Sequence, residues 1–216
     1  GYCGPDWPGA VKGKIKSTGK NSGDGTLLAD IEAKDLGGRL RGRALSGRGN
    51  LHIDGDVYAG DVALTLGQSR VTAKGRMAAT MELDASFAPL QLNDLLPTGN
   101  GTLRGTLQLR GARTAPDVTV DLVGDAIHYG DYRATHMLAK GELPWRNGNG
   151  DLLVDASGLA LGLPLQGLHI RARGAVEHLQ LEGHANGDIG KLAFTGSTNK
   201  QGARWQGVLA SLKFAP

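Results

Sequence analysis

The chain has few of the residues that mark a disulfide-rich domain, an aromatic core or a membrane-spanning helix. It holds one cysteine among 216 residues, so no disulfide framework can form within it. Aromatic residues make up only 5% of the chain, so any core must be built mainly from leucine, valine and alanine. No run of about 18 apolar residues occurs, and we therefore expect no transmembrane helix.

Motifs with a recognisable catalytic or metal-binding mechanism are also missing. The six histidines stand at no metal-ligand spacing, and no HExxH or CxxC motif occurs. Neither a GxSxG nucleophile elbow nor a Walker-type phosphate loop is present. His169 and His184 fall at polar positions of alternating stretches, which favours a surface place for both. We expect no catalysis, no cofactor and no bound metal.

Glycine and strict alternation are what the chain has in abundance. Glycine accounts for 35 of the 216 residues, about twice its ordinary share of roughly 7%. In residues 71–87, VTAKGRMAATMELDASF, every second residue from Val71 is apolar or glycine, and seven of the eight between are polar. This period of two is typical of a strand with one apolar and one wet face. It returns in residues 103–110, 168–174 and 179–185.

Dipeptides that suit tight hairpin turns separate these stretches. They are Asp24-Gly25, Asp54-Gly55, Asn100-Gly101, Asn147-Gly148, Asn149-Gly150 and Asn186-Gly187. Helix signals are confined to residues 89–97, PLQLNDLLP, which have room for one short turn. We predict an all-β fold, a long and mostly antiparallel meander of about a dozen to fifteen strands.

The net charge of +3 is mildly basic. Two alternating basic runs carry much of it: Lys12, Lys14 and Lys16, then Arg39, Arg41 and Arg43. No aromatic residue interleaves them, as base stacking would require. We interpret both runs as the polar face of strands and predict no nucleic-acid partner.

A sheet with an apolar face must cover it with another layer, by closure, or with a ligand. Many positions on this face are glycine or alanine, which would leave room above it. We predict that the larger residues line an apolar groove: Val71, Met77, Met81, Leu83, Phe87, Leu103, Leu107, Leu109, Leu168, Ile170, Leu179 and Leu181.

Several segments, taken in order, resemble one known family. They include LGGRLRGRALSGRGNLHIDG (36–55), GTLRGTLQLRGARTAPDVTVDLVGDAIHYGDYRA (101–134) and GAVEHLQLEGHANG (174–187). The chain resembles the TamB family, the inner-membrane subunit of the translocation and assembly module, within the AsmA-like, repeating β-groove group. The resemblance covers nearly all 216 residues.

The resemblance implies a sheet curled into an elongated groove, the β-taco, with an apolar concave face. It implies two continuous groove segments, residues 1–98 and 99–216, of an internal fragment. It also implies a periplasmic place in a Gram-negative bacterium, where a lipid-conducting bridge carries phospholipid acyl chains between inner and outer membrane.

The partners implied are an inner-membrane anchor outside this chain and TamA, a BamA-like outer-membrane barrel, with a linked role in outer-membrane protein assembly. Because an open sheet leaves unpaired edges, self-association of the fragment is also expected.

Two alternatives share the alternation. A glycine-rich structural or adhesive β-solenoid would fill its core and carry no lipid. A transmembrane barrel would need aromatic girdles at both membrane interfaces, and the three Trp and four Tyr are too scattered to form them.

Overall fold

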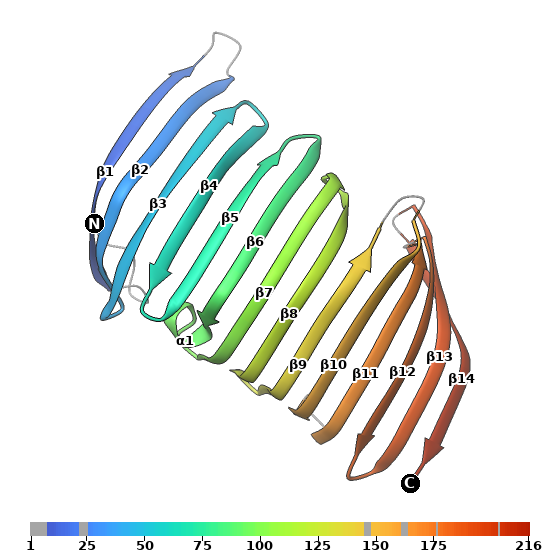
Figure 1. Cartoon of the computed structure of the whole chain (residues 1–216). Helices are drawn as coiled ribbons and strands as arrows, with labels where there is room; N and C mark the ends of the chain where they lie inside the picture. Colours follow the sequence, from blue (N-terminus) through green and yellow to red (C-terminus); the bar gives the residue numbers. More distant parts are fainter. Residues whose placement is uncertain (1–7, 22–25, 145–147, 161–163, 176, 203) are drawn as a thin grey trace.

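One antiparallel sheet contains every strand of the part of the chain that is described. The computed structural model describes residues 8–21, 26–144, 148–160, 164–175, 177–202 and 204–216. Its strands follow one another across the sheet in chain order (Figure 1). They are β1 (Gly9–Asn21), β2 (Leu27–Leu40), β3 (Arg43–Asp54), β4 (Val57–Leu66), β5 (Ser69–Met77), β6 (Thr80–Gln91), β7 (Gly99–Ala112), β8 (Ala115–Tyr129), β9 (Tyr132–Leu143), β10 (Gly150–Ala160), β11 (Pro164–Ala175), β12 (His178–Gly187), β13 (Gly190–Gln201) and β14 (Arg204–Ala215).

The sheet is open. β1 and β14 are its two edges and do not pair with each other, so it is not closed into a barrel. Figure 1 shows it twisting along its length and curling at β12–β14. The predicted all-β antiparallel meander is confirmed, and its arrangement is not the parallel coil of a solenoid.

The alternating stretch 71–87 is a hairpin, not the single strand that its periodicity suggested. β5 and β6 meet at a turn around Ala78, whose N–H donates to the Thr80 carbonyl at 2.7 Å. Met77 pairs directly with Met81, four residues on. Because four is an even number, the alternation passes through the turn without a break, and sequence periodicity could not reveal it.

The predicted turn dipeptides have mixed outcomes. Asp54-Gly55 does lie at the turn from β3 to β4, and Asn186-Gly187 ends β12 just before the next turn. Asn100-Gly101 instead lies inside β7, where the register with β8 shifts. Asn149-Gly150 marks the start of β10. Asp24-Gly25 and Asn147 lie outside the described residues.

The short helical turn predicted in residues 89–97 is confirmed as α1 (Leu92–Leu95), between β6 and β7. The proposed segment boundary at residues 98 and 99 falls between α1 and β7. Since β6 pairs with β7 across that point, the sheet runs through it without interruption. The division into two groove segments stays a prediction.

Candidate functional site: the apolar face of the sheet

Strand register lines up apolar residues in rows that cross the sheet. Directly opposed residues of antiparallel strands share a face, so a chain of such pairs traces one row. One row crosses all fourteen strands: Ile15, Ala33, Gly49, Val62, Ala73, Ala85, Leu107, Val120, Gly141, Leu152, Ala172, Leu181, Gly196 and Leu209. The row beside it crosses β2–β14: Leu36, Gly47, Leu64, Val71, Phe87, Gly105, Leu122, Ala139, Val154, Ile170, Gly183, Phe194 and Leu212. None of these 27 residues has a polar side chain.

These rows form a continuous apolar surface that stays largely uncovered. Large side chains along it, such as Leu64, Phe87 and Ile170, are partly exposed. The molecule exposes 13,453 Å², whereas a compact monomer of 22.5 kDa would expose roughly 9,500 Å². An apolar area this continuous usually marks a place where a partner or ligand binds.

This surface contains a hollow of about 590 Å³ over β2–β6. Its lining includes Leu36, Val62, Leu64, Met77 and Met81. Polar residues that border it, such as Lys74 and Glu82, occupy alternate positions of β5 and β6, so their side chains belong to the other face of the sheet. The hollow is therefore apolar and lacks a charged group to fix a ligand's orientation.

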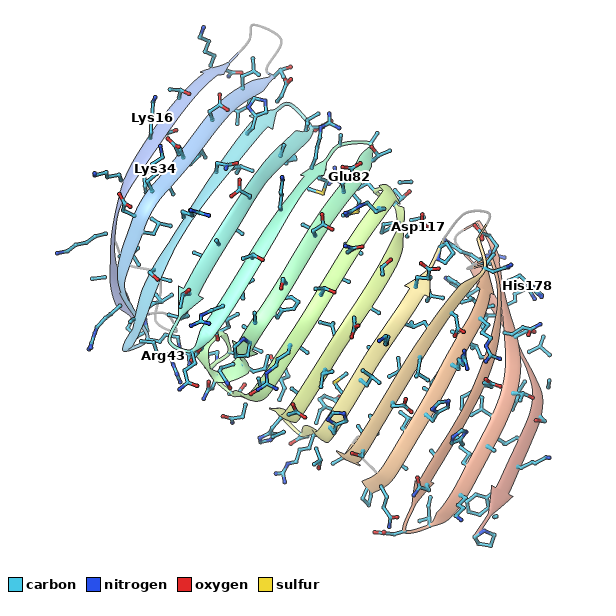
Figure 2. The ribbon with its side chains drawn as sticks, in the orientation of Figure 1. Lys16, Lys34, Arg43, Glu82, Asp117 and His178 are labelled. Atoms are coloured by element: carbon cyan, nitrogen blue, oxygen red, sulfur yellow. The ribbon has the colours of Figure 1, made fainter. Side chains whose placement is uncertain are left out.

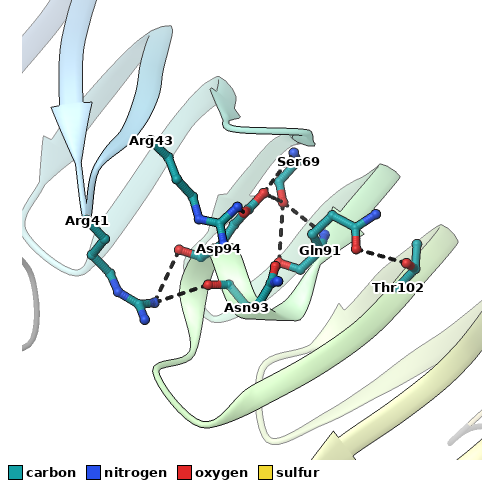
Figure 3. A network of polar contacts seen from close by, with 7 residues as sticks. All are labelled: Arg41, Arg43, Ser69, Gln91, Asn93, Asp94 and Thr102. Carbon is teal, nitrogen blue, oxygen red and sulfur yellow. Dashed lines mark hydrogen bonds and ion pairs between the residues drawn. The ribbon is translucent and has the colours of Figure 1, made fainter.

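Helix α1 folds over the apolar face at one end of the strands. Register places Arg43 opposite Leu40, and Ser69 opposite Leu66, so both polar residues stand at apolar-face positions. Both contact Asp94 of α1, whose side chain is fully buried (Figure 3). We call Arg43, Ser69 and Asp94 the α1 latch.

The latch satisfies the buried carboxylate with one cation and two donors. Arg43 forms an ion pair with Asp94 Oδ1, and the Ser69 Oγ and N–H donate to Oδ2 at 2.6 and 3.1 Å. The Gln91 N–H in turn donates to Ser69 Oγ at 2.9 Å. A buried charge is tolerated only with such compensation. Arg41 also reaches the carbonyl oxygens of Asn93 and Asp94, each at 3.4 Å.

The α1 latch corrects one interpretation of the sequence and adds residues that it missed. Arg39, Arg41 and Arg43 were all expected on the polar face of strands, but Arg41 lies in the turn between β2 and β3, and Arg43 lies on the apolar face. The sequence did contain an indication of the contribution of Arg43 and Ser69. Both are polar residues at positions where the alternation predicts apolar ones. Asp94 gave no such signal, because its partners are 25 and 51 residues away.

Comparison with known proteins decides the family. The sequence profile of the family described as TamB, N-terminal domain, matches residues 2–216. The chain belongs to the TamB family. A relative, the translocation and assembly module subunit TamB of Haemophilus influenzae, is 21% identical over 217 residues. That match covers 97% of this chain and 17% of the relative, so the chain spans about a sixth of that protein. No solved structure matches it.

All twelve residues predicted to line a groove lie on the apolar face of this TamB-family sheet. Val71 and Phe87, Met77 and Met81, and Leu83 and Leu109 are directly opposed pairs. The other six take apolar-face positions on β7, β11 and β12. Of the twelve, Met77, Met81 and Leu83 line the hollow, and Leu179 is 8% exposed. Their contact with lipid stays a prediction.

The opposite face carries charges of alternating sign in cross-strand pairs. Lys74 lies opposite Asp84, and the Lys140 ammonium lies 3.5 Å from Asp121. Figure 2 shows charged side chains such as Lys34 and Glu82 spread over the sheet. The hydrogen bond and charge of Glu32 raise the pKa of Lys34. This face is therefore polar and solvent-exposed, and each exposed ion pair of this kind contributes little to the stability of the fold.

His169 and His184 lie on this polar face, as the alternation indicated. His169 lies opposite His184, and their rings stack with centroids 4.5 Å apart. The His169 Nδ1 also contacts Asp155. Among the described residues no group of three or more His, Cys, Asp or Glu is arranged to hold a metal ion. Nor does the described part of the chain contain a helix that is long and apolar enough to cross a membrane.

Proposed function

We propose that this segment carries phospholipid acyl chains along its apolar face, as part of a periplasmic bridge between inner and outer membrane. The observation that carries the proposal is the pair of unbroken apolar rows running across the strands. A path for a lipid must be apolar along its whole length. An acyl chain that covered a charged side chain would remove it from water, which costs free energy.

The energetics of acyl transfer fit such a surface. Each CH₂ group removed from water gains about 0.8 kcal/mol, so a 16-carbon chain gains on the order of 12 kcal/mol when fully covered. The small residues between the leucines leave the rows without bulky side chains that would block an acyl chain. A lipid is therefore held by the apolar surface area that it covers, and it can move from strand to strand.

The length of the rows suits a bridge. Adjacent strands lie about 4.8 Å apart, so fourteen strands span roughly 60 Å. The H. influenzae relative is named as a subunit of a translocation and assembly module, and we extend that role to this chain. Within it we place an inner-membrane anchor outside this chain and the outer-membrane barrel TamA as partners, with outer-membrane protein assembly as a linked role.

A charge placed on the apolar face tests the proposal. In the full-length protein, a photoreactive amino acid at Leu83 should crosslink to phospholipid in cells. Leu107→Arg should lower that crosslinking at least about tenfold, because an unpaired cation beside an acyl chain costs more than 1.4 kcal/mol. Met81→Asp should act in the same way.

The matched controls place the same charges one residue away. Gln108→Arg and Thr80→Asp lie on the polar face next to each test position, and crosslinking should stay at the wild-type level. If the control variants lower crosslinking as much as the test variants, or if Leu83 never crosslinks to lipid, the proposed function is wrong.

A further inference from the structure

The strands that line the apolar hollow differ in chemistry between their two ends. At one end the face is filled by α1, beneath which Leu66 and Leu90 are 5% and 7% exposed. At the other end the hollow reaches Tyr58, Met77 and Met81, next to the turns that join β3 to β4 and β5 to β6. Tyr58 is 38% exposed there, so this end meets water.

α1 (Leu92–Leu95) closes one end of the apolar face, and we call it the wall. Asp94 is fully buried and neutralised by Arg43, and Ser69 is 2% exposed with its hydroxyl between Asp94 and Gln91. Gly67, in the turn before Ser69, leaves space for the carboxylate: a Cβ there would lie 3.1 Å from both Asp94 oxygens. The wall, which joins β6 to β7, is therefore held by contacts from two other hairpins, β2–β3 and β4–β5.

The two ends of a phospholipid differ in how they can contact the wall. The methyl end of an acyl chain is apolar and loses nothing by meeting Leu66 and the leucines around α1. The phosphate headgroup is ionic, and removing it from water without a partner is costly. Among the described residues, the two arginines beside α1 already have partners: Arg43 pairs with Asp94, and Arg41 reaches the carbonyl oxygens of Asn93 and Asp94.

We propose that α1 orients the cargo: acyl chains lie along β3–β6 with their methyl ends toward the α1 latch. Their headgroups emerge at the opposite end, beside Tyr58 and Met77. This inference rests on the proposed function and adds the direction in which the lipid lies along the strands. The bound species is a diacyl phospholipid whose headgroup keeps its water.

Two phospholipids with a photoactivatable diazirine test this orientation. One carries the diazirine at the terminal acyl carbon and the other at the acyl carbon next to the glycerol. Each is incorporated in vesicles and incubated with the full-length protein, and adducts are mapped by mass spectrometry. The terminal-carbon lipid should mark Leu45, Leu64 and Leu66 over Ile53, Tyr58 and Met77 by more than about tenfold, because burying the headgroup disfavours the reverse orientation by more than that.

The glycerol-side lipid should show the opposite preference. Adducts from it beside Arg41 and Arg43 would overturn the inference, because the headgroup would then bind at the latch. Equal marking of both ends by both lipids would also overturn it, while leaving the proposed function supported. Absence of any adduct on the apolar face would overturn both.

Variants of the latch connect the orientation to α1. Asp94→Asn removes the ion pair with a side chain of the same shape, and Ser69→Ala removes a hydroxyl but keeps the ion pair. Both should reduce the end preference toward equality. Asp84→Asn removes an ion pair of similar chemistry with Arg110 on the polar face and should leave the preference intact. A latch variant that retains a folded sheet and the full preference would show that α1 does not orient the lipid.

Discussion

At the residue scale, the least expected feature is a buried ion pair in a sheet that is otherwise largely solvated. Asp94 is the one large side chain among the described residues that is fully buried. Its partners Arg43 and Ser69 reach it from β3 and β5. Removing one partner of such a pair leaves a buried charge uncompensated, which is far costlier than losing an exposed pair.

We therefore predict that Arg43→Ala loosens α1. The expected loss of local stability is about 3 kcal/mol, which would speed amide hydrogen exchange in α1 and the β4–β5 turn by roughly a hundredfold. Arg48→Ala, on the same strand but the polar face, should change these rates little. Equal effects of the two substitutions would mean that the latch contributes no more than a surface arginine.

A second residue-scale prediction concerns acid. The Arg171 Nε donates to Asp151 Oδ1 at 2.7 Å across β10 and β11, and this hydrogen bond holds the pKa of Asp151 below its ordinary value of 3.8. Because the folded pKa is lowered, the contribution of the pair is complete above pH 3.8 and is lost as pH falls through the lowered value.

Hydrogen exchange in β10–β11, corrected for intrinsic rates, should accordingly accelerate in that acid range. Asp151→Asn should abolish this pH dependence, since no carboxyl is left to protonate. Acceleration that persists unchanged in the variant would assign it to another group.

At the element scale, sequence alternation assigned the faces of the strands, apart from the end of β3 at Arg43, but it did not show how the strands pair. A period of two is local, so the residues between Val71 and Phe87 reveal their shared face without any tertiary information. The turn inside that stretch was hidden, because Met77 and Met81 pair across an even spacing. The contact of Asp94 with Arg43 was unpredictable for a different reason: it joins elements 51 residues apart.

Glycine inside a strand has a specific cause at Gly105 in β7. Its φ is +128°, and a Cβ there would lie 1.8 Å from the Asp121 carbonyl oxygen of β8. We predict that Gly105→Ala costs about 1–3 kcal/mol, because both the backbone conformation and the strand spacing must change. Gly207→Ala in β14 is the control, since its nearest neighbours lie 3.9 Å away.

The damage from Gly105→Ala should stay local, because strands of a meander contact mainly their neighbours. Hydrogen exchange should therefore increase in β7 and β8 while β12–β14 remain protected. Loss of protection along the whole sheet would show that the fourteen strands unfold as one cooperative unit instead.

At the scale of the whole molecule, the two edges of the sheet are protected unequally. β1 carries Lys12, Lys14, Lys16 and Lys20, and edge lysines discourage pairing with another chain. β1 also exposes Val11 and Ile15, whereas β14 exposes four apolar side chains, Val208, Leu209, Leu212 and Phe214, by 57–60% each. An unpaired strand with apolar side chains on both faces is a template for further pairing.

We predict that these 216 residues, as a separate polypeptide, associate through β14 and not through β1. Analytical ultracentrifugation should show a concentration-dependent dimer. The double variant Val208→Lys and Leu212→Lys should weaken it by more than tenfold, because burying two such side chains contributes about 3 kcal/mol. Val11→Lys, on the β1 edge, should leave the dimer unchanged. A dimer that survives the β14 substitutions but dissociates with Val11→Lys would mean that the lysines of β1 do not protect its edge, and the assignment of the edges would be reversed.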